Sequence, residues 1–233
     1  MLNKNDVVKS IFKAWRDVTE FIENTQDEEN KYNFKPEYLI TVKVAENILL
    51  YFFNNNISEQ YSILLEEKTS MAMTRREEEV IEYSKSRVPR KFRSKKETKR
   101  KGRFDIVVYK KESFYTLDSY RTVCVIEVKN YYGYFKKIQE DINRIFEFTN
   151  KDVKNNSFEF GIMTFIIKPQ KKDWESIYNG EISIIENYKE NIVKNLNLKS
   201  KWDLDIEVIS KRYSDPDYPI LQYLYIVAII TIL

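Results

Sequence analysis

Apolar residues recur at helical spacing in two stretches near the start of the chain. The first stretch predicts an amphipathic helix over residues 6–24. The second predicts a helix from Pro36, which suits the first helical turn, to about Phe53. Its predicted apolar face holds Leu39, Val42, Ala45, Leu49 and Phe53. Glu46 belongs to that same face, so a carboxylate is expected beside the apolar stripe.

Short apolar runs predict strands further along the chain. The predicted strands are YSILLEE at 61–67, RFDIVVY at 103–109, TVCVIEVKN at 122–130, FEFGIMTFIIK at 158–168 and LDIEVIS at 204–210. The continuous run at 158–168 is typical of a strand covered on both faces. Residues 134–148 and 174–196 carry helical patterns, and the polar residues between the second and third strands are hairpin-like.

This order of elements predicts an α/β fold with a central mixed sheet flanked by helices. No repeat or linker divides residues 1–233, which favours one domain with a helical extension at 1–35, a core at 36–213 and an apolar segment at 214–233. The 14 apolar-rich residues at 220–233 are too few for the ~20 needed to cross a bilayer. We expect them to form a buried strand or helix, with a homodimer contact left open.

Charge is distributed unevenly along the chain. Residues 85–103 contain eleven Lys or Arg and one acid, Glu97, whereas the whole chain carries only +3. A basic segment on an otherwise acidic body predicts contact with the phosphates of a nucleic acid. The candidate binding residues are Lys91, Arg93, Lys95, Lys96, Lys99, Arg100, Lys101 and Arg103. The alternative is a solvated charged loop.

The chain contains no histidine and one cysteine, Cys124. The lack of histidine excludes Ser-His and Cys-His catalysis, HNH-type nucleases and histidine zinc sites. A single cysteine excludes an intrachain disulfide, and no secretory signal pattern is present, so we expect a cytoplasmic protein without membrane association. Hydrolytic chemistry would then depend on carboxylates, lysine and hard metal ions.

Four E-x-K triplets occur, but only Glu127-Val128-Lys129 closes a strongly apolar run. Residues i and i+2 of a strand share a face, so Glu127 and Lys129 point to the same side. Asp105 stands 22 residues earlier inside another apolar run. If the two strands pair as a hairpin, the three charged groups converge.

Three charges within two core strands are costly unless they are paired or bound to metal. One interpretation is a buried ion pair. The other is a site in which Asp105 and Glu127 bind Mg²⁺ or Mn²⁺ through oxygen ligands. Lys129 would then orient or deprotonate the attacking water, with its pKa lowered by the neighbouring cation.

The helix with Glu46, the strand with Asp105, the strand with Glu127-Val128-Lys129 and the following helix and strand resemble the PD-(D/E)XK (restriction-endonuclease-like) nuclease superfamily. The resemblance covers about residues 36–168 and implies an αβββαβ core. It makes Asp105 the motif aspartate and Glu127 and Lys129 the (D/E)XK pair. It also implies that the Val128 carbonyl and Glu46 are additional metal ligands.

Two features depart from the family pattern. Phe104 replaces the proline that names the motif. Gln139 is followed four residues later by Asn143, so the Gln-x-x-x-Tyr signature of the RecB-like branch is incomplete.

The resemblance implies a magnesium-dependent endonuclease or exonuclease that acts on DNA in restriction, defence or repair. A catalytically inactive nuclease-like module that binds nucleic acid or supports an assembly is one alternative. A resolvase of Holliday-junction type is another.

Overall fold

The computed structural model describes residues 2–25, 36–68, 103–114, 117–130, 135–149, 160–212 and 221–232. Its helices are α1 (Lys4–Thr25), α2 (Pro36–Asn54), α4 (Phe135–Thr149), α5 (Trp174–Tyr178) and α6 (Ile182–Asn195), with a short 3₁₀ turn at Lys171–Asp173. Its strands are β1 (Tyr61–Lys68), β2 (Arg103–Phe114), β3 (Leu117–Lys129), β4 (Phe160–Ile167), β5 (Asp203–Arg212) and β6 (Leu221–Ile232).

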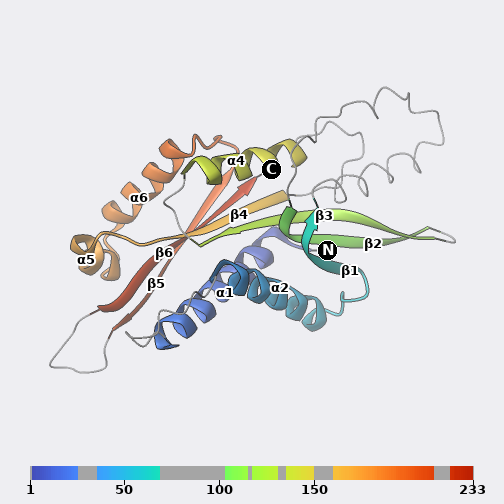
Figure 1. Ribbon diagram of the computed structural model, residues 1–233, viewed down its shortest axis with the longest axis horizontal. Helices are drawn as coiled ribbons and strands as arrows, with labels where there is room; N and C mark the ends of the chain where they lie inside the picture. The colour runs from blue at the N-terminus through green and yellow to red at the C-terminus, as the bar shows by residue number, and fades with distance from the viewer. Residues whose placement is uncertain are drawn as a thin grey trace.

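The six strands form one mixed sheet in the order β1-β2-β3-β4-β6-β5. β3 and β4 run parallel, joined by a crossover through α4, and the other neighbours are antiparallel. Helices α1 and α2 cover one face of the sheet, and α4, α5 and α6 cover the other (Figure 1). The predicted α/β class with a central mixed sheet flanked by helices is therefore confirmed.

Strands β2 and β3 are longer than their apolar runs. The polar residues between the runs pair with one another as far as Phe114 and Leu117. β2 and β3 therefore form a long antiparallel pair. The end of this pair at Phe114 and Leu117 extends beyond β1 and β4, the neighbouring strands (Figure 1).

The predicted helix over 174–196 is two helices. Gly180 separates α5 from α6 with a φ of 77°, a left-handed conformation that ends a helix at low cost for glycine.

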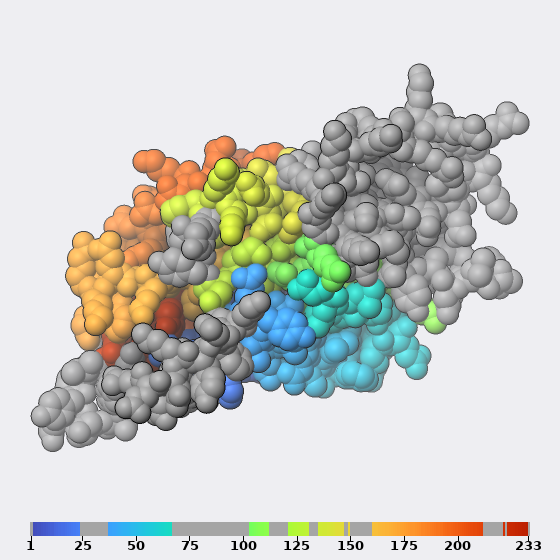
Figure 2. All heavy atoms as spheres, viewed as in Figure 1, coloured from blue at the N-terminus to red at the C-terminus, as the bar shows by residue number. Residues whose placement is uncertain are grey.

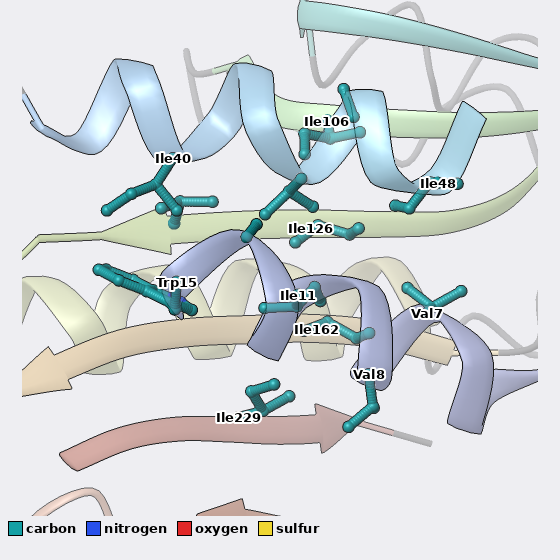
Figure 3. Close-up of a cluster of buried hydrophobic side chains, with 14 of the residues drawn as sticks. Val7, Val8, Ile11, Trp15, Ile40, Ile48, Ile106, Ile126, Ile162 and Ile229 are labelled. Atoms are coloured by element: carbon teal, nitrogen blue, oxygen red, sulfur yellow. The ribbon is translucent and has the colours of Figure 1, made fainter. Parts of the chain in front are cut away.

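The face covered by α1 and α2 is built on isoleucines from adjacent strands. Ile106, Ile126 and Ile162 are lateral neighbours on β2, β3 and β4 (Figure 3). Trp15 of α1 is buried against them, and its indole N–H donates a hydrogen bond of 2.8 Å to the Thr164 hydroxyl on β4. Helix α1, the described part of the predicted N-terminal extension, therefore contributes to the core.

Helix α2 buries a different stripe from the one predicted. Its buried apolar residues are Ile40, Val44, Ala45, Ile48 and Phe52. Val42, Leu49 and Phe53 of the predicted stripe are exposed. Because α2 is apolar on most of its circumference, its sequence pattern permits several faces, and packing against α1 and the sheet selects one.

On the opposite face, α4 lies very close to β4. The predicted inward stripe of this helix is Phe135, Ile138, Ile142 and Ile145; the three isoleucines are buried, whereas Phe135 at the first position of the helix is exposed. A Cβ added to Gly161 of β4 would overlap the Cγ2 of Ile145. The missing side chain at Gly161 therefore permits the close approach that positions α4 over the end of β3.

The C-terminal apolar segment is neither an appendage nor a surface strand. β6 lies between β4 and β5 and pairs with both, and its core residues Leu224, Ile226, Val227, Ala228, Ile229 and Ile230 are fully buried. The open choice between strand and helix is resolved as a strand, and its apolar surface is covered within the chain. Among the residues that the structure describes, no helix has the length and apolarity to cross a membrane.

Candidate active site

Asp105 lies where the ladder between β2 and β3 ends, one residue before the last registered pair, Ile106 and Ile126. On the other side, Glu66 of β1 has a φ of 54°, and Leu65 and Glu67 pair with Ile106 and Phe104 in an unchanged register, so Glu66 stands opposite Asp105. The Asp105 carboxylate accepts a hydrogen bond of 2.7 Å from the Val128 N–H of β3.

Glu127 points to the α4 face of the sheet, because Val125 packs on that face and successive residues of a strand alternate. Only 1% of its surface is exposed. One carboxylate oxygen forms an ion pair with Arg144 of α4, and the other lies 3.6 Å from the Lys129 ammonium. Glu127 is therefore a buried charge held by two cations.

Lys129 is the last residue of β3, and its ammonium reaches both helical layers. It lies 3.4 Å from the Glu37 carboxylate of α2 and 3.5 Å from the Asp141 carboxylate of α4. Side chains of α2 (light blue) and α4 (yellow-green) are both exposed on the face of the molecule shown in Figure 2. Lys129 thus joins the two layers at the end of the strand.

Arg144 is inward-facing. Its guanidinium contacts Glu127 and lies 2.8 Å from the Asp141 carboxylate, and its Cζ is 5.3 Å from the centre of the Phe104 ring. The Nε of Arg144 is buried and has no hydrogen-bond partner among the described residues. The helical pattern of residues 134–148 predicts that Arg144 lies on the polar face of the helix, as a solvated residue or a phosphate contact, and the structure corrects this prediction.

The structure brings Asp105, Glu127 and Lys129 together, as the hairpin hypothesis requires. It adds three residues that the sequence interpretation missed. We use the name charge cluster for the following six residues: Glu37, Asp105, Glu127, Lys129, Asp141 and Arg144. For Asp141 and Arg144 the available signal in the sequence was their position at the border of the apolar stripe of α4. Asp141 follows Ile138 by three residues, and Arg144 directly precedes Ile145.

Glu46 is not part of the charge cluster, which corrects its predicted position. Its carboxylate pairs with Lys43 at 2.8 Å and its side chain is 52% exposed. Glu46 follows Glu37 by nine residues, which is about 13 Å along a helix and half a turn out of phase. The α2 carboxylate nearest to the site is therefore that of Glu37, and the error follows from the wrong choice of buried face for α2.

Burial raises the pKa of the Asp105 carboxyl, although Lys129 and the Val128 N–H act in the opposite direction. Burial, reinforced by the Asp105 charge, also raises the pKa of Glu127 well above its ordinary value, against the effects of Arg144 and Lys129. The two carboxyl groups interact directly. Two such groups in a buried site favour a shared proton or a bound cation.

Burial lowers the pKa of the Lys129 ammonium, but the carboxylates of Glu127, Asp105 and Asp141 together outweigh this effect and leave the pKa raised. In the metal-free site Lys129 is therefore held in its protonated form. The pKa lowering expected beside a bound metal stays a prediction.

The charge cluster contains four carboxylates and two cations, which leaves a formal charge of −2. Carboxylate oxygens are the donors that Mg²⁺ and Mn²⁺ prefer, so the donor set and the charge both suit a hard divalent cation. The described residues contain no ready-made group of three or more His, Cys, Asp or Glu side chains in ligand geometry. Asp105 and Glu127 are the residues that would hold the ion, and the ligand role of the Val128 carbonyl stays a prediction.

Most of the predicted nucleic-acid contacts fall outside the described residues. These are Lys91, Arg93, Lys95, Lys96, Lys99, Arg100 and Lys101. Arg103 is described and is exposed at the first position of β2. The basic segment therefore ends two residues before Asp105, on the same strand.

Comparisons of the chain with protein-family models, with curated proteins and with solved structures found no match.

Proposed function

We propose that this protein is a divalent-metal-dependent nuclease of the PD-(D/E)XK type that hydrolyses phosphodiester bonds of DNA. The observation that carries the proposal is the convergence of Asp105, Glu127 and Lys129 at the ends of β2 and β3, within a cluster that has two more negative than positive charges. Glu37 is 44% exposed but Glu127 and Asp141 are largely buried, and a surplus of buried carboxylates destabilises a fold unless a proton or a cation neutralises it.

The topology supports the same function. Among the described elements, α2 is followed by the antiparallel strands β1, β2 and β3, then by α4, and then by β4 parallel to β3. This order is compatible with the αβββαβ core that the sequence resemblance implies, which supports the proposal. The paired carboxylates also lie on the two strands where that resemblance requires them.

In this proposal the side chains of Asp105 and Glu127 bind the cation. A bound Mg²⁺ or Mn²⁺ supplies charge neutralisation for the phosphoryl oxygens and lowers the pKa of a coordinated water. The Val128 N–H fixes the Asp105 carboxylate through its 2.7 Å hydrogen bond, and the rigid β-ladder thereby orients the ligand. Lys129 carries its proton among the carboxylates, so it acts first as a donor that orients the attacking water and the phosphate.

The basic segment supplies the expected contact with the substrate. Its lysines and arginines lead into β2 at Arg103, beside the strand position of Asp105. Reversing charges within residues 91–103 should weaken DNA binding and reduce its dependence on salt, because fewer counterions are released. Unchanged affinity would identify the segment as a solvated loop.

The decisive experiment is a cleavage assay with wild type and Asp105→Asn purified in parallel. Supercoiled, linear, single-stranded and four-way-junction DNA, together with RNA, are incubated with Mg²⁺ or Mn²⁺, with and without EDTA. We expect wild type to cut DNA only with free metal and Asp105→Asn to be inactive. Equal activity in both proteins would mean that the cutting arises elsewhere.

The other outcomes identify the alternatives. Binding of DNA without cleavage under every metal condition would favour the inactive nuclease-like module. Cleavage confined to four-way junctions would favour a resolvase built on the same site.

A further inference from the structure

Arg144 forms an ion pair with Glu127, the carboxylate that binds the metal ion in the proposed function. Its guanidinium contacts Oε1 of Glu127, and the Lys129 ammonium lies at Oε2. Because Glu127 is 1% exposed, water cannot take the place of these cations. A divalent cation that binds Glu127 must therefore compete with the guanidinium for the same oxygens.

The position of Arg144 is suited to such an exchange. Asp141, one helical turn earlier, provides a second carboxylate at 2.8 Å, and the Phe104 ring lies beneath the guanidinium at 5.3 Å. The buried Nε has a free hydrogen-bonding position among the described residues. If Arg144 releases Glu127, its charge is still balanced by Asp141 and its plane is still supported by the ring.

We propose that Arg144 is a positioning residue of the metal site that holds Glu127 in the metal-free protein and sets the metal affinity by competing for it. This inference rests on the proposed function. The guanidinium keeps the Glu127 side chain in place without metal, and binding of the divalent ion requires the Arg144–Glu127 ion pair to open.

The test is a calorimetric titration of Mn²⁺ into wild type, Arg144→Gln and Arg144→Lys. Removing the competing guanidinium should tighten Mn²⁺ binding by about tenfold in Arg144→Gln. This is the change expected if the Arg144–Glu127 ion pair is open in about one wild-type molecule in ten. Arg144→Lys keeps a cation at this position and should stay close to the wild-type affinity. A residue that only supports the fold would give the opposite result, because losing it would leave Glu127 misplaced and would weaken binding.

Arg16→Gln is the matched control. Arg16 makes a similar guanidinium–carboxylate contact with Glu207, remote from the charge cluster on the exposed side of α1. Its loss should leave Mn²⁺ affinity unchanged. Thermal melting adds a second readout: metal-free Arg144→Gln should melt below wild type, and Mn²⁺ should raise its melting temperature by more than it raises that of wild type.

A measurement on wild type is independent of the stability of any variant. In protein labelled with ¹⁵N-arginine, opening of the ion pair should shift one protected Nε–H resonance as Mg²⁺ is added, while exposed arginines do not respond. No shift of any protected resonance during saturable Mg²⁺ binding would overturn the inference.

The proposed function and the proposed role of Arg144 can be refuted by different results. If wild type binds no divalent ion, the proposed function fails. If wild type binds Mn²⁺ and cuts DNA but Arg144→Gln binds no more tightly, only the role of Arg144 is wrong.

Discussion

Two ion pairs between an arginine and a glutamate occur in very different surroundings. In the Arg144–Glu127 pair the side chains are 15% and 1% exposed, whereas in the Arg16–Glu207 pair they are 51% and 29% exposed. A surface pair contributes about 0–1 kcal/mol, since water solvates both partners almost as well. A buried pair must first lose its hydration, which makes it a poor stabilising device. The surplus of carboxylates around Glu127 therefore fits the metal-binding role proposed for it, whereas the pair at Glu207 needs no such role.

Lysine substitutions should give the largest contrast between the charge cluster and the surface. Lys129→Met should lower metal-dependent cleavage by about 10²–10⁴-fold, the usual contribution of a group that handles a proton or orients a nucleophile. Lys43→Met removes a lysine that pairs with Glu46 on the exposed side of α2 and should leave the rate unchanged. Single-turnover cleavage rates at saturating metal provide the measurement. Equal losses in both variants would remove the distinction between the two regions.

The two glutamates of α2 sharpen the comparison within a single helix. Glu37→Gln should reduce cleavage or metal affinity by about tenfold, because Glu37 contacts Lys129 from outside the ligand set. Glu46→Gln should have no measurable effect. The same titrations and rate measurements distinguish them, and a larger loss at Glu46 would restore the assignment made from the sequence resemblance.

Replacing Glu127 or Glu207 by glutamine should change the free energy of unfolding in different ways. The pKa of Glu127 is raised by burial, so the folded protein binds more protons than the unfolded chain at this position and loses stability as the pH rises from about 4.3 through the raised pKa. Glu127→Gln should therefore flatten the decline in the free energy of unfolding of the metal-free protein over this range, while abolishing cleavage. Denaturant unfolding at several pH values tests it.

Glu207→Gln serves as the control for that series. Because this carboxylate is on the surface, its replacement should change the free energy of unfolding by no more than about 0.5 kcal/mol at any of these pH values. A pH dependence that changes equally in both variants would show that burial of Glu127 is not its cause.

The smallest effect is expected at the surface pair itself. A double-mutant cycle with Arg16→Gln and Glu207→Gln should give a coupling energy below about 1 kcal/mol that decreases further with added salt. A coupling as large as that of a buried pair would show that the exposed and the buried ion pairs do not differ in energy.

The sequence predicts those parts of the site that depend on local geometry. Alternation along a strand places Glu127 and Lys129 on one side of β3, and two apolar runs joined by a polar connection favour the β2–β3 hairpin that brings Asp105 to them. The helix residues are harder to predict. Asp141 and Arg144 lie at the border of an apolar stripe, where the same pattern suits a solvated charge and an inward-facing one.

Long-range arrangement accounts for the remaining differences. The apolar run of β6 predicts a buried element, but its place between β4 and β5 depends on contacts with residues far away in the chain. The sequence of α2 does not determine which face of the helix is buried, for a similar reason. Several faces of this helix are apolar, and the contacts with α1 and the sheet that choose Ile40, Val44 and Ile48 are not encoded in its own periodicity.

The placement of β6 also constrains the order of events during synthesis. The hairpin that carries Asp105 and Glu127 can form as soon as it leaves the ribosome, since its partners are close in sequence. Among the described strands, β5 pairs only with β6, which is translated later, so a nascent chain halted before Leu221 would expose the unpaired edges of both β4 and β5. Such a product is expected to aggregate or to be degraded before the fold is complete.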